Sequence, residues 1–206
     1  MADTKGGTPM SVHDFFSTGA VDVKGLSKYF DGLNNETRIK EARELTPKEQ
    51  ARLFDAAEGF KPVSLNDFVP KDFPPMKQVI HFGRNSMPMF RFFEKRFCRP
   101  DGKEAADRLW GYNQSGQIIN TFVGPGYFVA KQDSAKEVVI DYWEVPPRKP
   151  EGWPEILPNS AKLSRVVFYH MKDYMRGVST HVSIGRAKRG DKIANNWFVL
   201  CRDGTV

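Results

Sequence analysis

The stretch that decides the fold is LSRVVFYHMKDYMRGVSTHVSIGRAKRGDKIANNWFVLCRD, residues 163–203. Three of its segments, 163–173, 178–186 and 196–202, are short and rich in β-branched and aromatic residues. Two turn signals separate them, YMRG at 174–177 and KRGD at 188–191. This pattern predicts three strands in an antiparallel meander.

The register of the first hairpin determines a candidate site. A four-residue loop at 174–177 would place Asp173 opposite Val178 and His170 opposite His181. Side chains alternate across a sheet, so one face of this hairpin would be apolar. The other face would carry Phe168, His170, Ser179, His181 and Ser183. That second face would be either solvent-exposed or the wall of a polar cavity, and a loop of another length would break the histidine pair.

The N-terminal part reads as helical. Short helical patterns occupy 11–20 and 23–33, and the clearest helix begins at the capping box Thr46-Pro47-Lys48-Glu49 and ends at Gly59. We also expect a helix over residues 86–98, because Phe90, Phe93 and Phe97 would share one side of it. A strand over 89–98 is rejected, since its alternation would put charges on both faces.

The C-terminal part reads as β structure. Segments 108–114 and 117–123 flank a hairpin signal at 113–116, and segments 127–132 and 137–145 flank residues 133–135. The proline-rich residues 146–162 carry Trp153 and Ile156 and are expected to form a cover or lid.

Together these patterns predict an α+β fold in which N-terminal helices pack on a curved antiparallel sheet or a partly closed β-barrel of about seven strands. We expect a disordered tail at 1–10 and one domain at 11–206. Residues 11–99 would be mainly helical and residues 105–206 mainly antiparallel β.

Composition narrows the class of protein. The 206 residues carry a net charge of +6, which only weakly favours an anionic partner, and two cysteines are too few for a disulfide framework. No apolar run approaches the ~20 residues that span a bilayer, and residues 1–16 lack the basic flank and apolar core of a secretory signal. We therefore expect a cytoplasmic protein without a membrane span.

No established catalytic or nucleotide-binding motif is present in the sequence. The candidate acid–base residues are His170, His181 and Asp141, because imidazoles titrate near neutral pH and a carboxylate within a buried strand has a raised pKa. The competing interpretation is that the histidines face solvent and that Asp141 is a paired structural acid. No metal site is predicted, and the sequence leaves any cofactor unknown.

The leading hypothesis is binding of a hydrophobic or amphipathic small molecule with a polar or acidic head, in an apolar pocket enclosed by sheet and helices. The candidate ligand-binding residues are Tyr112, Tyr127, Tyr142, Trp143, Phe168, Arg176, Ser179 and Ser183. The alternatives are an acid–base enzyme of the isomerase, cyclase or lyase type in the same pocket, and an interaction module without a pocket. Basic and aromatic residues alternate in residues 91–97, but on a helix those rings would face the core, so nucleic acid is not the expected partner.

Overall fold

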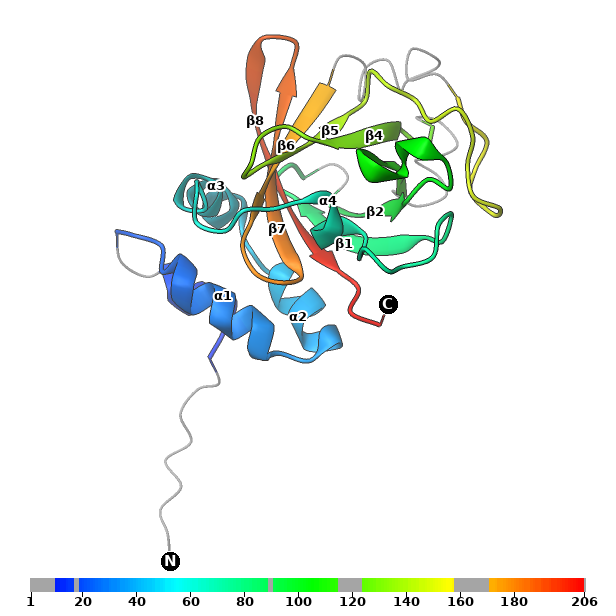
Figure 1. The fold of residues 1–206 in the computed structure, drawn as a ribbon. Coiled ribbons are helices and arrows are strands. Elements are labelled where there is room, and N and C mark those ends of the chain that lie inside the picture. The colour runs from blue at the N-terminus through cyan, green and yellow to red at the C-terminus, as the bar shows by residue number, and fades with distance from the viewer. Residues whose placement is uncertain (1–9, 17–18, 89–90, 115–123, 158–170, 206) are drawn as a thin grey trace, which may run out of the picture.

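A closed, eight-stranded antiparallel barrel forms the body of the protein (Figure 1). The computed structural model describes residues 10–16, 19–88, 91–114, 124–157 and 171–205. Each strand pairs with the next in sequence, and β8 pairs with β1. The strands are β1 Val79–Asn85, β2 Phe92–Cys98, β3 Arg108–Gln114, β4 Tyr127–Gln132, β5 Val138–Asp141, β6 Met171–Gly177, β7 Val182–Arg189 and β8 Lys192–Arg202. The predicted α+β class is confirmed, with a fully closed barrel and eight strands in place of about seven.

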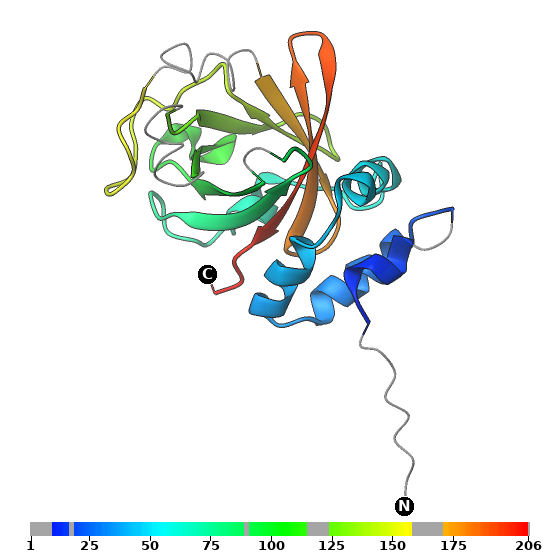
Figure 2. The same cartoon turned by 180° about the vertical axis from the view of Figure 1, so that it is seen from behind.

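Helices cover one flank of this barrel. In both views the helices α1, α2 and α3 lie beside β7 and β8 (Figure 1, Figure 2). The helices are η1 Val12–Phe16, α1 Val23–Gly32, α2 Asn35–Ala42, α3 Pro47–Ala56, α4 Leu65–Phe68 and η2 Lys103–Ala106. Apolar side chains of the first four pack on outward-facing residues of β7 and β8, among them Ile184 and Val199. Within the described residues, no helix has the length and apolar character needed to cross a membrane.

The start of α3 follows the sequence pattern. The Glu49 carboxylate accepts from the Thr46 backbone amide at 2.8 Å, and the Thr46 hydroxyl accepts from the Glu49 amide at 3.3 Å. The predicted capping box is therefore confirmed, with Pro47 at the first helical position, where no intrahelical hydrogen bond is lost.

Two further elements cover parts of the barrel, one at its end and one on its outside. The short helix α4 places Phe68 against the inward-facing His81 and Phe97, and this end is called the lower end here. On the outside of β3 and β4, Trp153 lies against Tyr112 and Tyr127. The proline-rich segment is thus a cover, as predicted, for the outer surface of the sheet over its described residues.

The helix predicted over residues 86–98 is wrong. Residues 92–98 form β2, between β1 and β3. Phe93, Lys95 and Phe97 point into the barrel, whereas Phe92 and its alternate neighbours point out. Charges do fall on both faces of this strand, and the one on the inner face, Lys95, is buried.

The predicted register of the first meander hairpin is also wrong. Residues 174–177 belong to β6, the turn lies at 178–181, and Asp173 pairs with Ala187 in place of Val178. The turn predicted at 174–177 is wrong because these strand residues end in a glycine and therefore have the composition of a loop. The second hairpin is confirmed: Arg189 pairs with Lys192, and Gly190 adopts φ +55° in the turn.

Strand pairing elsewhere is partly as predicted. β4 and β5 form the predicted hairpin, with Gln132 opposite Val138. β3 pairs with β2 along one edge and with β4 along the other. Residues 117–123 lie outside the described part of the chain.

Aromatic rings fill the interior, and several of them pack closely against glycines on the neighbouring strand. Three inward-facing glycines each pair across the sheet with a phenylalanine, and a Cβ on any of them would stand 2.3–2.5 Å from that ring. The pairs are Gly83–Phe93, Gly111–Phe128 and Gly185–Phe198. Because the rings occupy the space that side chains would need, the described interior is a packed core.

We expect Gly111→Ala to lower the free energy of unfolding by about 1–3 kcal/mol, because the added methyl overpacks the core against Phe128. Urea denaturation would measure the change. Gly32→Ala is the control: it ends α1 with open space around it, so it should be neutral or stabilising by about 0.5–1 kcal/mol. Equal effects of the two substitutions would contradict this account of the interior.

Candidate functional site

A polar cluster lies inside the barrel. The Lys95 ammonium donates to Asn113 Oδ1 at 2.9 Å, to Asp173 Oδ2 at 3.0 Å and to the Tyr142 hydroxyl oxygen. Every one of these side chains is at most 4% exposed. They come from β2, β3, β6 and the residue after β5, so the cluster joins four strands.

Aromatic rings surround the charge. The Lys95 Nζ lies 5.0–5.6 Å from the centroids of Phe93, Phe128, Tyr142 and Phe198. The negative faces of such rings attract a cation at this distance. The glycine–phenylalanine pairs that pack the core therefore also build the environment of Lys95.

The charged and hydrogen-bonding groups of this cluster are paired with one another. Burial lowers the pKa of Lys95, while the nearby Asp173 carboxylate opposes that shift. Burial and the Asp173 charge raise the pKa of Tyr142 well above its usual value, so its hydroxyl stays protonated and donates to Asp173 at 3.2 Å. Each ammonium proton already has an acceptor. The arrangement neutralises a buried cation and holds strands together.

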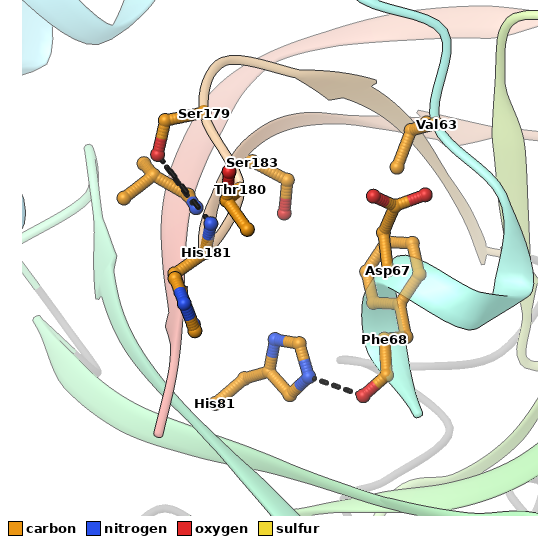
Figure 3. Close-up of a pocket in the computed structure, with 9 residues that line it drawn as sticks. Val63, Asp67, Phe68, His81, Ser179, Thr180, His181 and Ser183 are labelled. Atoms are coloured by element: carbon orange, nitrogen blue, oxygen red, sulfur yellow. Dashed lines mark hydrogen bonds between the residues drawn. The ribbon is translucent and has the colours of Figure 1, made fainter. Parts of the chain in front are cut away.

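A second polar site lies at the lower end (Figure 3). His81 and His181 line a small pocket with Asp67, Ser179 and Ser183. The His81 Nε2–H donates to the Phe68 carbonyl at 2.9 Å, which leaves the His81 Nδ1 as a buried acceptor without a partner within the described structure. The space open to the centre of a water molecule is about 10 Å³, which is room for about one water.

Both of these histidines are neutral at pH 7. Burial lowers the pKa of His81 to about 3, and the positive charge of Arg202 adds to this effect. Burial, followed by Arg202 and Arg38, lowers the pKa of His181 to about 4. Their pocket can hold a water molecule but has no space for a substrate.

A larger hollow lies on the surface between α3 and strands β6, β7 and β8. Its volume is about 460 Å³, within the range of small-molecule sites. Its apolar lining comes from Phe54, Tyr174, Ala187 and Ile193. Ile193 is 61% exposed, so one side of this groove presents apolar surface to water.

The groove also carries charges of both signs. Arg176 is fixed by Glu137 at 2.6 Å and by the Phe54 carbonyl at 2.9 Å, and its guanidinium lies over the Phe54 ring. Arg186 donates to the Ala194 carbonyl and lies over Trp197. Lys188 lines the groove, and no carboxylate lies within ion-pair distance of it in the described part of the chain.

Two of the three predicted catalytic residues, Asp141 and His181, lie within the described structure, and they lie apart. Asp141 lies on the outer face at the end of β5, where it pairs with Lys172 at 2.8 Å. His181 follows the opposite end of β6, so about 16 Å of strand separates the two positions. His170 lies outside the described residues. His181 instead shares its pocket with His81, which sequence analysis did not place in the candidate site.

The predicted ligand-binding residues are spread over four places. Tyr142 belongs to the inner cluster, Ser179 and Ser183 to the lower pocket, and Arg176 to the surface groove. Tyr112 and Tyr127 lie under Trp153 on the outer face, Trp143 is 54% exposed, and Phe168 lies outside the described residues. Among the described residues, no group of three or more His, Cys, Asp or Glu side chains could hold a metal ion.

Sequence reasoning missed Lys95 and Lys188. The signal for Lys95 was present: Phe93 and Phe97 flank it at strand spacing, and Asp173 likewise stands between Met171 and Met175. A single cation in one apolar strand face and a single anion in another indicate a buried pair, because neither charge is tolerated alone.

Comparison of the chain with protein-family models, curated proteins and solved structures finds no match. The barrel architecture is compatible with small-molecule binding, and the choice of site depends on the geometry described above.

We expect Lys95→Met to lower the free energy of unfolding by about 3–5 kcal/mol, because it leaves Asp173 buried without its cation. The double variant Lys95→Met/Asp173→Leu removes both charges and should be more stable than Lys95→Met alone. Urea denaturation of both single variants and of the double variant measures this coupling. Additive losses would contradict a mutually dependent buried pair.

The lower pocket predicts a pH dependence. The pKa of His81 in the folded protein lies below its ordinary value of 6.5, so the unfolded chain binds protons more readily as pH falls from 6.5 towards 3. The free energy of unfolding should therefore keep its full value above pH 6.5 and decrease as the pH drops below 6.5. His81→Gln keeps a donor for the Phe68 carbonyl but cannot titrate, so its slope should be shallower by up to about 1.4 kcal/mol per pH unit. Equal slopes in urea titrations from pH 7 to pH 4 would refute this.

Proposed function

We propose that the groove between α3 and strands β6–β8 binds an apolar small molecule with an acidic head. The observation that carries this proposal is a hollow of about 460 Å³ that joins exposed apolar surface at Ile193 to the ammonium of Lys188, which has no ion-pair partner among the described residues. Binding sites of this size commonly combine an apolar lining with few polar groups.

The apolar part of the ligand would lie against Phe54, Tyr174 and Ile193. Covering Ile193 removes apolar surface from water, at about 25 cal/mol per Å². Phe54 is already buried by α3 packing, and Arg176 over its ring makes that wall rigid. The ligand would therefore meet a preformed wall on the helix side and an exposed side chain on the hairpin side.

The acidic head would lie at the Lys188 side of the groove. Arg176 is already neutralised by Glu137, and Glu58 also approaches it at 3.8 Å, so a carboxylate at that end would meet acids. Lys188 and Arg186 extend from β7 at the opposite side, where a carboxylate would gain a charge-assisted hydrogen bond. The barrel interior is not proposed as the site because its described part is filled.

We expect the fluorescent acid 11-(dansylamino)undecanoic acid to bind with 1:1 stoichiometry, and dodecanoate to displace it better than dodecanol. Lys188→Glu and Ile193→Glu should each weaken binding by about 10-fold, which corresponds to 1.4 kcal/mol. Lys192→Glu is the matched control, since Lys192 is exposed on the same hairpin but does not line the groove. Fluorescence titration measures each dissociation constant.

Equal weakening by the control would show general charge attraction and no groove site. Absence of uptake, together with elution alongside a partner protein, would favour an interaction module instead.

A further inference from the structure

An exposed aromatic ring on β2 is surrounded by arginines. Phe92 points out of the barrel and is 47% exposed. Three guanidinium carbons lie near its centroid: Arg43 at 4.5 Å, Arg91 at 5.2 Å and Arg84 at 6.0 Å. They come from the end of α2, from the residue before β2 and from β1. Three parts of the chain thus place positive charge on one ring.

Little negative charge balances this cluster. The Glu44 carboxylate approaches Arg84 only at 4.0 Å, and Glu94, whose charge also acts on Arg43, pairs with Arg96 at 2.8 Å. Within the described structure, the Nε atoms of Arg43 and Arg84 are buried without an acceptor. Three like charges that share a ring repel each other, so an anion bound among them would relieve that repulsion.

Of these arginines, Arg84 is also held in place. Arg84 donates to the Arg43 carbonyl at 2.6 Å, and its side chain is only 8% exposed. Burial lowers the pKa of Arg43 and of Arg84, an effect that an anionic ligand would oppose. A guanidinium group fixed in this way loses little conformational entropy when it binds.

We propose that Phe92, Arg43, Arg84 and Arg91 form a binding site for a nucleoside phosphate, free or within a single strand. Guanidinium groups bind phosphate oxygens in a bidentate manner, and a base can stack on the exposed part of the Phe92 ring. The alternating basic and aromatic residues 91–97 would not bind nucleic acid on a helix, because a helix would bury their rings. On the strand, Phe92 faces outward, so that reason no longer applies. This site is separate from the α3 groove.

The test is fluorescence anisotropy of a fluorescein-labelled dT12 oligonucleotide at 50 and 200 mM salt, with ATP and tripolyphosphate as competitors. We expect salt-dependent binding, weakened about 10-fold by Phe92→Ala because a stacked base is lost. Arg43→Gln should weaken binding and reduce the salt slope by about 0.7, since one phosphate contact on a single strand is lost. Lys192→Gln, at an exposed lysine of the β7–β8 turn, should leave the affinity unchanged.

The competitors identify the source of the ligand. Displacement by ATP at concentrations comparable to the oligonucleotide supports a free nucleotide, and displacement by unlabelled dT12 alone supports a single strand. Tripolyphosphate that competes as well as ATP, with no effect of Phe92→Ala, would overturn the proposal in favour of simple anion binding. Absent binding, or equal loss in the Lys192→Gln control, would overturn it as well. Phe92 and Lys192 are exposed and Arg43 is partly exposed, and circular dichroism checks that each variant folds.

Discussion

The ion pair between Lys95 and Asp173 is the constraint on which the rest of the barrel depends. Strands β2 and β6 are not neighbours, so the two charges meet only across a closed barrel. Before closure each is an uncompensated charge in an apolar strand face, and burial is tolerated only once the partner arrives. The acceptors Asn113 and Tyr142 complete the coordination of the ammonium. Closure of the barrel and pairing of Lys95 with Asp173 are therefore linked. An open sheet of the same strands would leave Lys95 without Asp173.

A filled interior moves the available binding surface to the outside. Rings such as Phe128 and Phe198 occupy the space above their paired glycines and at the same time surround Lys95. Helices α1–α3 cover the β7–β8 flank, and the Trp153 segment covers part of β3 and β4. Apolar and basic side chains remain exposed next to these covering segments. The groove at Ile193 lies beside α3, and the Phe92 site lies where α2 ends.

Local signals were predictive where the interactions that decide them are local. The Thr46–Glu49 capping box involves residues three apart, and the turn at Gly190 needs only a residue that adopts positive φ. Residues 91–97 failed for the opposite reason. Phe90, Phe93 and Phe97 satisfy helical spacing, and a strand over 92–98 becomes favourable because Asp173, nearly eighty residues away, neutralises Lys95. No local pattern contains that partner.

The sequence by itself determined the α+β class, the antiparallel order of most strands and the position of the N-terminal helices, because hydrophobic periodicity and capping are properties of short segments. Only the tertiary structure decided the register of β6 on β7, the closure through β2, and which side chains share a site. A register shift of a few residues changes the partners of His181 and Arg176 without changing the apolar pattern of either strand. Site residues therefore depend on pairing across the barrel, which long-range packing and the buried charges select.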